Sequence, residues 1–147
     1  MQSGDDPNKP TITAAQAATQ AQQYVKDLIV VFPAEATLEQ HGDVLTGPCA
    51  NPSGVGFDKR VQASVDYWIR GLDAARYHEY FDAMKAWLPA GGWTIDTDSR
   101  PKDMFLHANR ADDEFTLTLQ ANNKGGLSIG AASPCVWPNG TPDPTSH

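Results

Sequence analysis

The sequence contains no apolar run long enough to cross a membrane as a helix. Its most apolar segment, Leu28–Phe32 (LIVVF), is short, whereas a spanning helix needs about 18 or more apolar residues in succession. The opening residues, MQSGDDPNKP, also lack the charged stretch followed by an apolar stretch that marks a secretory signal. We therefore expect either a cytosolic protein or a mature form from which a signal has been removed.

Positive charge is scarce and scattered. The chain has 11 basic and 18 acidic residues, and its formal net charge is −7. A nucleic-acid partner needs a stripe of lysine and arginine that follows the phosphate backbone, and none is present. The acidity also argues against electrostatic docking on anionic lipid. We expect no nucleic-acid partner.

The sequence lacks the short motifs that mark common catalytic and cofactor sites. It contains no GxSxG, no P-loop, no GxGxxG and no HExxH. Two acidic clusters, Asp96 with Asp98 and residues 111–114 (ADDE), lack the glycine and the distant glutamate of a calcium-binding EF-hand loop. The four histidines are isolated from one another. We expect neither a cofactor nor a metal ion.

Only two cysteines are present, Cys49 and Cys135, and each directly follows a proline. A zinc site needs three or four ligands at characteristic spacings, which this pair does not supply. The interpretation we favour is a structural disulfide, which would stabilise the fold by roughly 4–5 kcal/mol in the chain-entropy model. Two buried free thiols or a catalytic thiol stay open. A disulfide would place the protein outside a reducing cytosol.

Composition divides the chain into three parts. Residues 1–11 are polar and rich in Pro, Gly, Asp and Asn, which is typical of a flexible tether. Residues 12–138 form a single domain, and its apolar content is sufficient for a core. The residues from 139 to 147 are expected to form a disordered tail.

Two helices are predicted in this domain. Thr13 and Gln16 fit a capping box at the start of the first helix, and Pro33 ends it. The second helix covers 74–88, with Asp73 as its N-cap, and the following PAGG sequence stops it. The apolar stripe of the first helix consists of Ala14, Ala18, Ala21, Val25, Leu28, Ile29 and Phe32.

Alternation of apolar and polar residues predicts the strands. It is clearest at 61–69, where Val61, Ala63, Val65, Tyr67 and Ile69 would share one face. Residues 34–60 are rich in glycine and proline and are expected to form a loop, with room for a short strand at 44–46. Four further strands joined by turns are predicted at 93–97, 104–109, 114–121 and 127–131.

These elements predict an α+β fold. One-faced alternation indicates an antiparallel sheet that is covered on one side only. We expect a two-layer sandwich in which a sheet of four to five strands carries two helices packed on one face.

Several segments together resemble a known group of proteins. They are the polar tether, the Ala-rich helix ending in LIVVFP, the GPC segment, the GGW before the later strands, and the closing LSIGAASPCVWP. Over residues 12–138 this layout is similar to small cell-envelope lipoproteins of actinobacteria, especially of mycobacteria and their phages. The resemblance implies a secreted domain that is lipid-anchored at the outer face of the cytoplasmic membrane. The cysteine that carries the lipid is absent, and Met1 stands where it could have been.

Side chains on the outward face of two predicted strands are the candidate binding residues. Trp68 shares that face with Asp66 and Arg70, and Phe105 shares it with His107. If the two strands are neighbours, they form an aromatic patch with polar groups that could bind a glycan, a lipid head group or a protein. Alternatively, the glycine- and proline-rich loop folds over this face and buries Trp68.

We therefore expect a monomeric, non-enzymatic envelope domain that binds a protein or an envelope glycolipid and contacts the membrane only through a lipid anchor. A protein partner is preferred, because one-faced strands suggest no long apolar tunnel. One alternative is a phage-encoded lipoprotein that excludes superinfecting phages. Others are a purely structural spacer and a small hydrolase-like enzyme that uses Asp66, His107 and Arg70.

Overall fold

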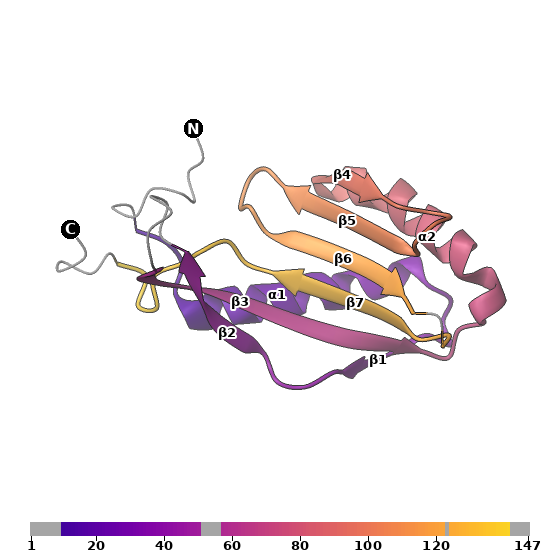
Figure 1. Ribbon diagram of the computed structural model, residues 1–147, viewed down its shortest axis with the longest axis horizontal. Helices are drawn as coiled ribbons and strands as arrows, with labels where there is room; N and C mark the ends of the chain where they lie inside the picture. Colours follow the sequence, from indigo (N-terminus) through magenta and orange to yellow (C-terminus); the bar gives the residue numbers. More distant parts are fainter. Residues whose placement is uncertain (1–9, 51–56, 123, 142–147) are drawn as a thin grey trace.

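The computed structural model of the protein describes residues 10–50, 57–122 and 124–141 (Figure 1). The helical elements are α1 (Ala14–Leu28), η2 (Ile29–Val31), η3 (Ala74–Arg76), α2 (Tyr77–Trp87) and η4 (Leu88–Gly91), where η denotes a 3-10 turn. The strands are β1 (Thr37–Gln40), β2 (Leu45–Ala50), β3 (Phe57–Arg70), β4 (Trp93–Asp98), β5 (Phe105–Arg110), β6 (Thr116–Ala121) and β7 (Leu127–Ala132).

Helix α1 begins at the predicted capping box. The Thr13 hydroxyl accepts a hydrogen bond from the Gln16 amide at 3.0 Å, and the Gln16 side chain accepts one from the Thr13 amide at 2.9 Å. The most deeply buried side chains of α1 are Ala17, Ala21, Val25 and Leu28. The two buried alanines let the first half of the helix lie close to β3 and β7, which it contacts.

The second predicted helix, 74–88, covers the 3-10 turn η3, helix α2 and the first residue of η4. Asp73 caps the 3-10 turn η3, where its carboxylate accepts a hydrogen bond from the Ala75 amide at 2.9 Å. Helix α2 then starts at Tyr77, and Gly92 follows η4 in the left-handed region with φ 92°. A side chain rarely adopts that conformation, so the glycine of the PAGG sequence stops the helical segment as predicted.

Within the part of the chain that the structure describes, the sheet has seven strands rather than the four to five predicted. Its order is β1-β3-β7-β6-β5-β4, with β2 also paired to β3, and every pairing is antiparallel. The predicted number was too low because Thr37–Gln40 and Leu45–Ala50 both pair with β3, whereas the sequence predicts at most a short strand at 44–46 in this segment. Their Gly47 and Pro48 are typical of turns, but an edge strand tolerates them since its outer side needs no partner.

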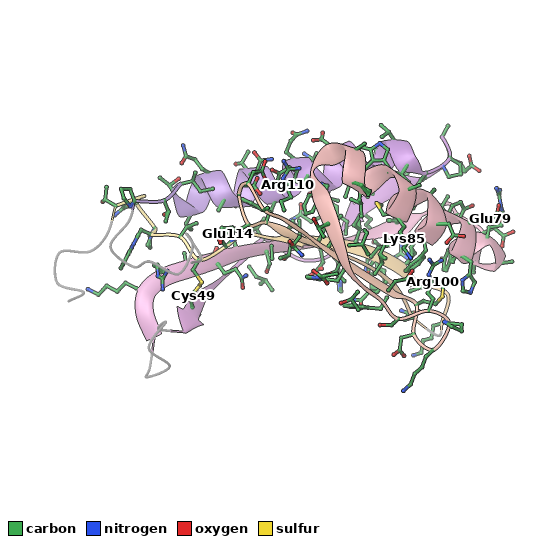
Figure 2. All side chains as sticks on the ribbon, turned by 90° about the horizontal axis from the view of Figure 1, so that it is seen from above. Cys49, Glu79, Lys85, Arg100, Arg110 and Glu114 are labelled. Carbon is green, nitrogen blue, oxygen red and sulfur yellow. A yellow bond between two sulfur atoms is a disulfide. The ribbon has the colours of Figure 1, made fainter. Side chains whose placement is uncertain are left out.

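The sheet and helices form two layers, and the class is α+β as predicted. Figures 1 and 2 show α1 and α2 on the same side of the sheet. Strand β3 has the predicted alternation, with Ala63, Val65, Tyr67 and Ile69 each at most 5% exposed beneath the helices. The polar residues between them lie on the opposite face of the sheet.

A disulfide joins Cys49 and Cys135, as the sequence predicts, with a Cα–Cα distance of 6.1 Å. It joins edge strand β2 to the segment that follows β7. The two cysteines are 86 positions apart in the sequence, so the bridge closes a long loop. Such a bridge fits an extracytoplasmic protein, because the cytosol keeps thiols reduced. Among the residues that the structure describes, no helix meets the length and hydropathy that a membrane crossing requires.

The two ends of the described chain lie side by side. The Thr11 amide donates a hydrogen bond to the Gly140 carbonyl at 2.9 Å, and the Ala14 amide donates one to Pro138 at 3.1 Å. The Trp137 amide donates to the Thr11 hydroxyl at 2.8 Å. Residues 1–9 of the predicted tether and 142–147 of the predicted tail lie outside the described residues.

Replacing both cysteines by alanine is expected to lower the free energy of unfolding by roughly 4–5 kcal/mol, because the unfolded chain regains the entropy of a long open loop. Urea unfolding followed by tryptophan fluorescence measures the difference. Wild type reduced with dithiothreitol should show the same loss. A double variant within about 1 kcal/mol of the oxidised wild type would mean that the bridge does not stabilise the fold.

Candidate functional site

The face of the sheet that points away from the helices is the candidate site, and we refer to it as the open face. On β3 it carries Gln62, Ser64, Asp66, Trp68 and Arg70, which alternate with the buried residues. All five side chains are exposed or half-buried. They therefore stand on a strand whose opposite face is fixed in the core.

Strand register aligns the open-face residues in rows across the sheet. Asp66 on β3 opposes Gly130 on β7, which opposes Thr118 on β6, which opposes His107 on β5. Two strands thus separate Asp66 from His107, which corresponds to about 14 Å at the usual strand spacing. The two predicted site strands, β3 and β5, are not neighbours.

A second row brings the aromatic residues to the two ends of a polar strip. Trp68 opposes Ser128 on β7, Ser128 opposes Gln120 on β6, and Gln120 opposes Phe105 on β5. Trp68 and Phe105 therefore do not form one continuous aromatic patch. Hydroxyl and amide side chains lie between them.

Gly130 lets the Asp66 side chain lie across the neighbouring strand. A Cβ atom at this glycine would stand 2.2 Å from the Asp66 Oδ1 atom, which no real contact allows. The Asp66 carboxylate therefore occupies the space above Gly130 on β7. It stays exposed to solvent.

Trp68 is half-buried and is held by neighbours on the same face. The His41 ring lies 4.9 Å from the Trp68 ring, and the Arg70 guanidinium lies 5.2 Å from the ring centre. Arg70 also pairs with Glu39 on β1 at 3.3 Å. Since His41 belongs to the segment between β1 and β2, that segment contacts Trp68 but does not bury it.

A hollow of about 210 Å³ lies beside the Trp68 ring. The polar residues Gln120, Asn122 and Ser128 line it together with Trp68. Asn122 accepts hydrogen bonds from the amides of Lys124 and Gly126 at 2.9 and 2.8 Å, which fixes the orientation of its side chain. An aromatic wall with fixed polar groups is the usual composition of a small-ligand subsite.

A polar cluster that sequence reasoning missed lies at the β4–β5 end of the open face. The His107 Nδ1 atom lies 2.8 Å from the Asp96 carboxylate, and Asn109 donates to the same carboxylate at 2.7 Å. The Thr97 hydroxyl donates to it at 2.9 Å. A register shift between Ile95 and Thr97 turns Asp96 onto this face, and simple alternation does not reveal such a bulge.

The charge state of Asp96 follows from these contacts. Partial burial opposes ionisation, but the hydrogen bonds from Asn109, His107 and Thr97 outweigh it, and the pKa of Asp96 lies below its ordinary value. At neutral pH the cluster therefore presents a carboxylate to the His107 ring. The side chains of His107 and Asp96 are 29% and 36% exposed, so the pair is accessible to a ligand.

The structure does not bring together Asp66, His107 and Arg70, the set that the hydrolase alternative requires. His107 contacts Asp96, Arg70 pairs with Glu39, and Asp66 lies two strands away from His107. In the described ranges no group of three or more histidine, cysteine or acidic side chains could hold a metal ion. Comparison with family models, with curated proteins and with solved structures finds no match to this chain.

A second charged cluster fixes the end of β4 against α2. Asp98 accepts hydrogen bonds from the Arg100 guanidinium at 2.8 and 2.9 Å and from Lys85 at 3.1 Å. Arg100 also pairs with Asp82 and lies over the Phe81 ring. The Arg100 hydrogen bonds hold the pKa of Asp98 well below its usual range.

Asp98→Asn is expected to lower the free energy of unfolding by about 2 kcal/mol at pH 7, the contribution of a hydrogen bond between charged groups. Because the folded state holds the pKa of Asp98 below the unfolded value of 3.8, this stabilisation is complete above that pH and is lost as the pH falls below it. Urea unfolding at pH 7 and at acidic pH measures both differences.

Asp82→Asn is the matched control, since Asp82 pairs with the same Arg100 but its side chain is 70% exposed. We expect this control to change stability by less than about 1 kcal/mol. If Asp98→Asn changed the free energy of unfolding equally at pH 7 and at pH 2.5, the stabilising role assigned to the ionised Asp98 carboxylate would be contradicted.

Proposed function

We propose that the protein is a non-enzymatic domain of the cell envelope, lipid-anchored at the outer face of the cytoplasmic membrane, that binds a partner protein through its open face. The observation that carries the proposal is Trp68, a half-buried ring on the open face that is held between the His41 ring and the Arg70 guanidinium. The disulfide and the resemblance to actinobacterial lipoproteins support the location.

The composition around Trp68 suits a protein interface. Tryptophan and arginine are the residues most enriched among those that dominate binding energy, and here Trp68 and Arg70 are stacked. Leu45, 65% exposed, lies across from Ser64 on the same face and adds apolar area farther along β3. Because these side chains stand on paired strands, a partner meets a preformed surface and little ordering opposes binding.

An envelope glycolipid is the second occupant to consider, and the hollow beside Trp68 favours it. Sugars stack on aromatic rings and hydrogen-bond to amides such as those of Gln120 and Asn122. A protein encoded by the bacterial chromosome would use this surface to bind an envelope component. A phage-encoded protein would use the same surface to exclude superinfecting phages. The identity of the captured molecule separates these alternatives.

The test places the photo-crosslinking residue p-benzoylphenylalanine at position 68 of the anchored protein in intact envelopes. We expect a discrete protein adduct, identified by mass spectrometry, because Trp68 lies at the centre of the proposed interface. The matched control carries the same residue at position 30, since Val30 is 70% exposed on η2. Trp68→Ala should reduce capture of the partner at least about tenfold in a competition experiment.

Identical adducts from positions 68 and 30, or unchanged capture by Trp68→Ala, would overturn the assignment of the open face. A glycolipid adduct in place of a protein adduct would select the alternative occupant. Thermal unfolding of each variant shows whether the fold is retained.

A further inference from the structure

The hollow of about 210 Å³ beside Trp68 is built from uncharged residues. It lies on the open face, and Figure 1 shows the turn between β6 and β7 beside the C-terminal end of β3 at this place. All the residues that line the hollow are exposed or half-buried, so a ligand can reach them. They are Trp68, Gln120, Ala121, Asn122, Gly126 and Ser128.

The glycine at position 126 keeps this hollow open. A Cβ atom there would stand 3.0 Å from the Cζ3 atom of the Trp68 ring and 2.8 Å from the Nδ2 atom of Asn122. These distances are too short for ordinary van der Waals contact, so any side chain would displace the ring or the amide. Because Gly126 has none, the Trp68 ring and the Asn122 amide border the same space.

The amide of Asn122 is oriented by its own turn. Its Oδ1 atom accepts hydrogen bonds from the backbone amides of Lys124 and Gly126 at 2.9 and 2.8 Å. The Nδ2 group is therefore the part of Asn122 that donates to a ligand. Gln120 adds a second amide, with two N–H donors and one oxygen acceptor, and the Ser128 hydroxyl adds a further oxygen.

The lining selects a neutral ligand. A carboxylate, phosphate or ammonium group that left water for this hollow would meet no opposite charge among the lining residues, which is unfavourable. Arg70 lies over the Trp68 ring but pairs with Glu39, and Lys124 belongs to the turn without lining the hollow. A molecule with several hydroxyl groups matches the amides, and its C–H groups match the aromatic wall.

We infer that this hollow binds a single neutral sugar ring, which lies against Trp68 and hydrogen-bonds to the amides of Gln120 and Asn122. Its volume of about 210 Å³ is below the roughly 300–1,000 Å³ of pockets that hold drug-sized ligands, so one ring fits. The inference rests on the open face as the binding surface, because Trp68 belongs to both sites. The sugar is carried either by the partner protein or by an envelope glycolipid, which share this chemistry.

Amide NMR of the isotopically labelled, disulfide-bonded chain tests the inference. The probes are the methyl glycosides of glucose, mannose and galactose. At least one of them should shift the side-chain amide signals of Gln120 and Asn122 and the indole signal of Trp68 in a saturable way. A Kd on the order of 1 mM is expected of so small a ligand. The remaining tryptophan indole signals should stay unchanged, because those residues do not line the hollow.

Two comparison ligands show which chemistry the hollow recognises. The first is the uronic acid of the sugar that binds best, which keeps the ring but carries a carboxylate. The second is cyclohexanol, which keeps a six-membered ring but has a single hydroxyl group. Each should bind at least about tenfold more weakly than that sugar, because the hollow offers amides and no cation.

Asn122→Asp keeps the Oδ1 acceptor that the turn uses and replaces the Nδ2 donor by a carboxylate oxygen. It should weaken sugar binding at least about tenfold. Asn139→Asp is the matched control, since it makes the same change at an exposed asparagine outside the hollow, and it should bind as wild type does. Gly126→Ala, which fills the hollow, is a second blocking variant.

The absence of saturable shifts with all the methyl glycosides would overturn the inference. So would equal affinity of wild type, Asn122→Asp and Gly126→Ala, or equally tight binding of the uronic acid or of cyclohexanol. A protein adduct from position 68 without sugar binding would overturn the sugar site alone. Sugar binding without a protein adduct would overturn the protein partner alone.

Capture from envelope extract by the wild-type protein, with and without the free sugar, identifies the source of the sugar. Release of a captured protein by the free sugar would assign the ring to a glycan on the partner. Release of a glycolipid would assign it to the envelope lipid. Both results support a sugar site in the hollow, and Asn139→Asp should behave as wild type in each.

Discussion

The rest of the structure depends on the pairing of β3 along both of its edges. This strand has 14 residues and pairs with β1 and β2 on one edge and with β7 on the other. Its alternation places every second side chain under the helices and leaves the others on the open face. A shift of one residue in this register would bury Asp66 and expose Tyr67, so the core and the candidate site are fixed by the same constraint.

Sequence reasoning found the features that depend on local chemistry. The capping box at Thr13, the alternation at 61–69 and the α+β class each follow from neighbouring residues, and the disulfide follows from having only two cysteines. It missed β1 and gave β2 only as a possible short strand at 44–46, because the pairing of both with β3 is a tertiary effect that overrides the turn preference of Gly47 and Pro48. It also missed the Asp96–His107 contact, since a register shift in β4 sets the direction of Asp96.

The disulfide and the open face are connected through β3. The open face combines Trp68, Arg70 and the polar Asp96–His107 cluster. The disulfide anchors β2 on the edge of β3, the strand that carries Trp68 and Arg70. One covalent bond therefore stabilises a strand that carries part of the candidate site, and such a bond suits a domain outside the reducing cytosol.

Native-state amide hydrogen exchange tests the central place of β3 most directly. A strand paired on both edges opens only with the whole fold, whereas an edge strand opens locally. We therefore expect the amides of residues 63–69 to exchange among the slowest in the protein, with protection close to the free energy of global unfolding, and those of edge strand β4 to exchange faster. Exchange of β3 that is as fast as exchange of β4 would contradict the account.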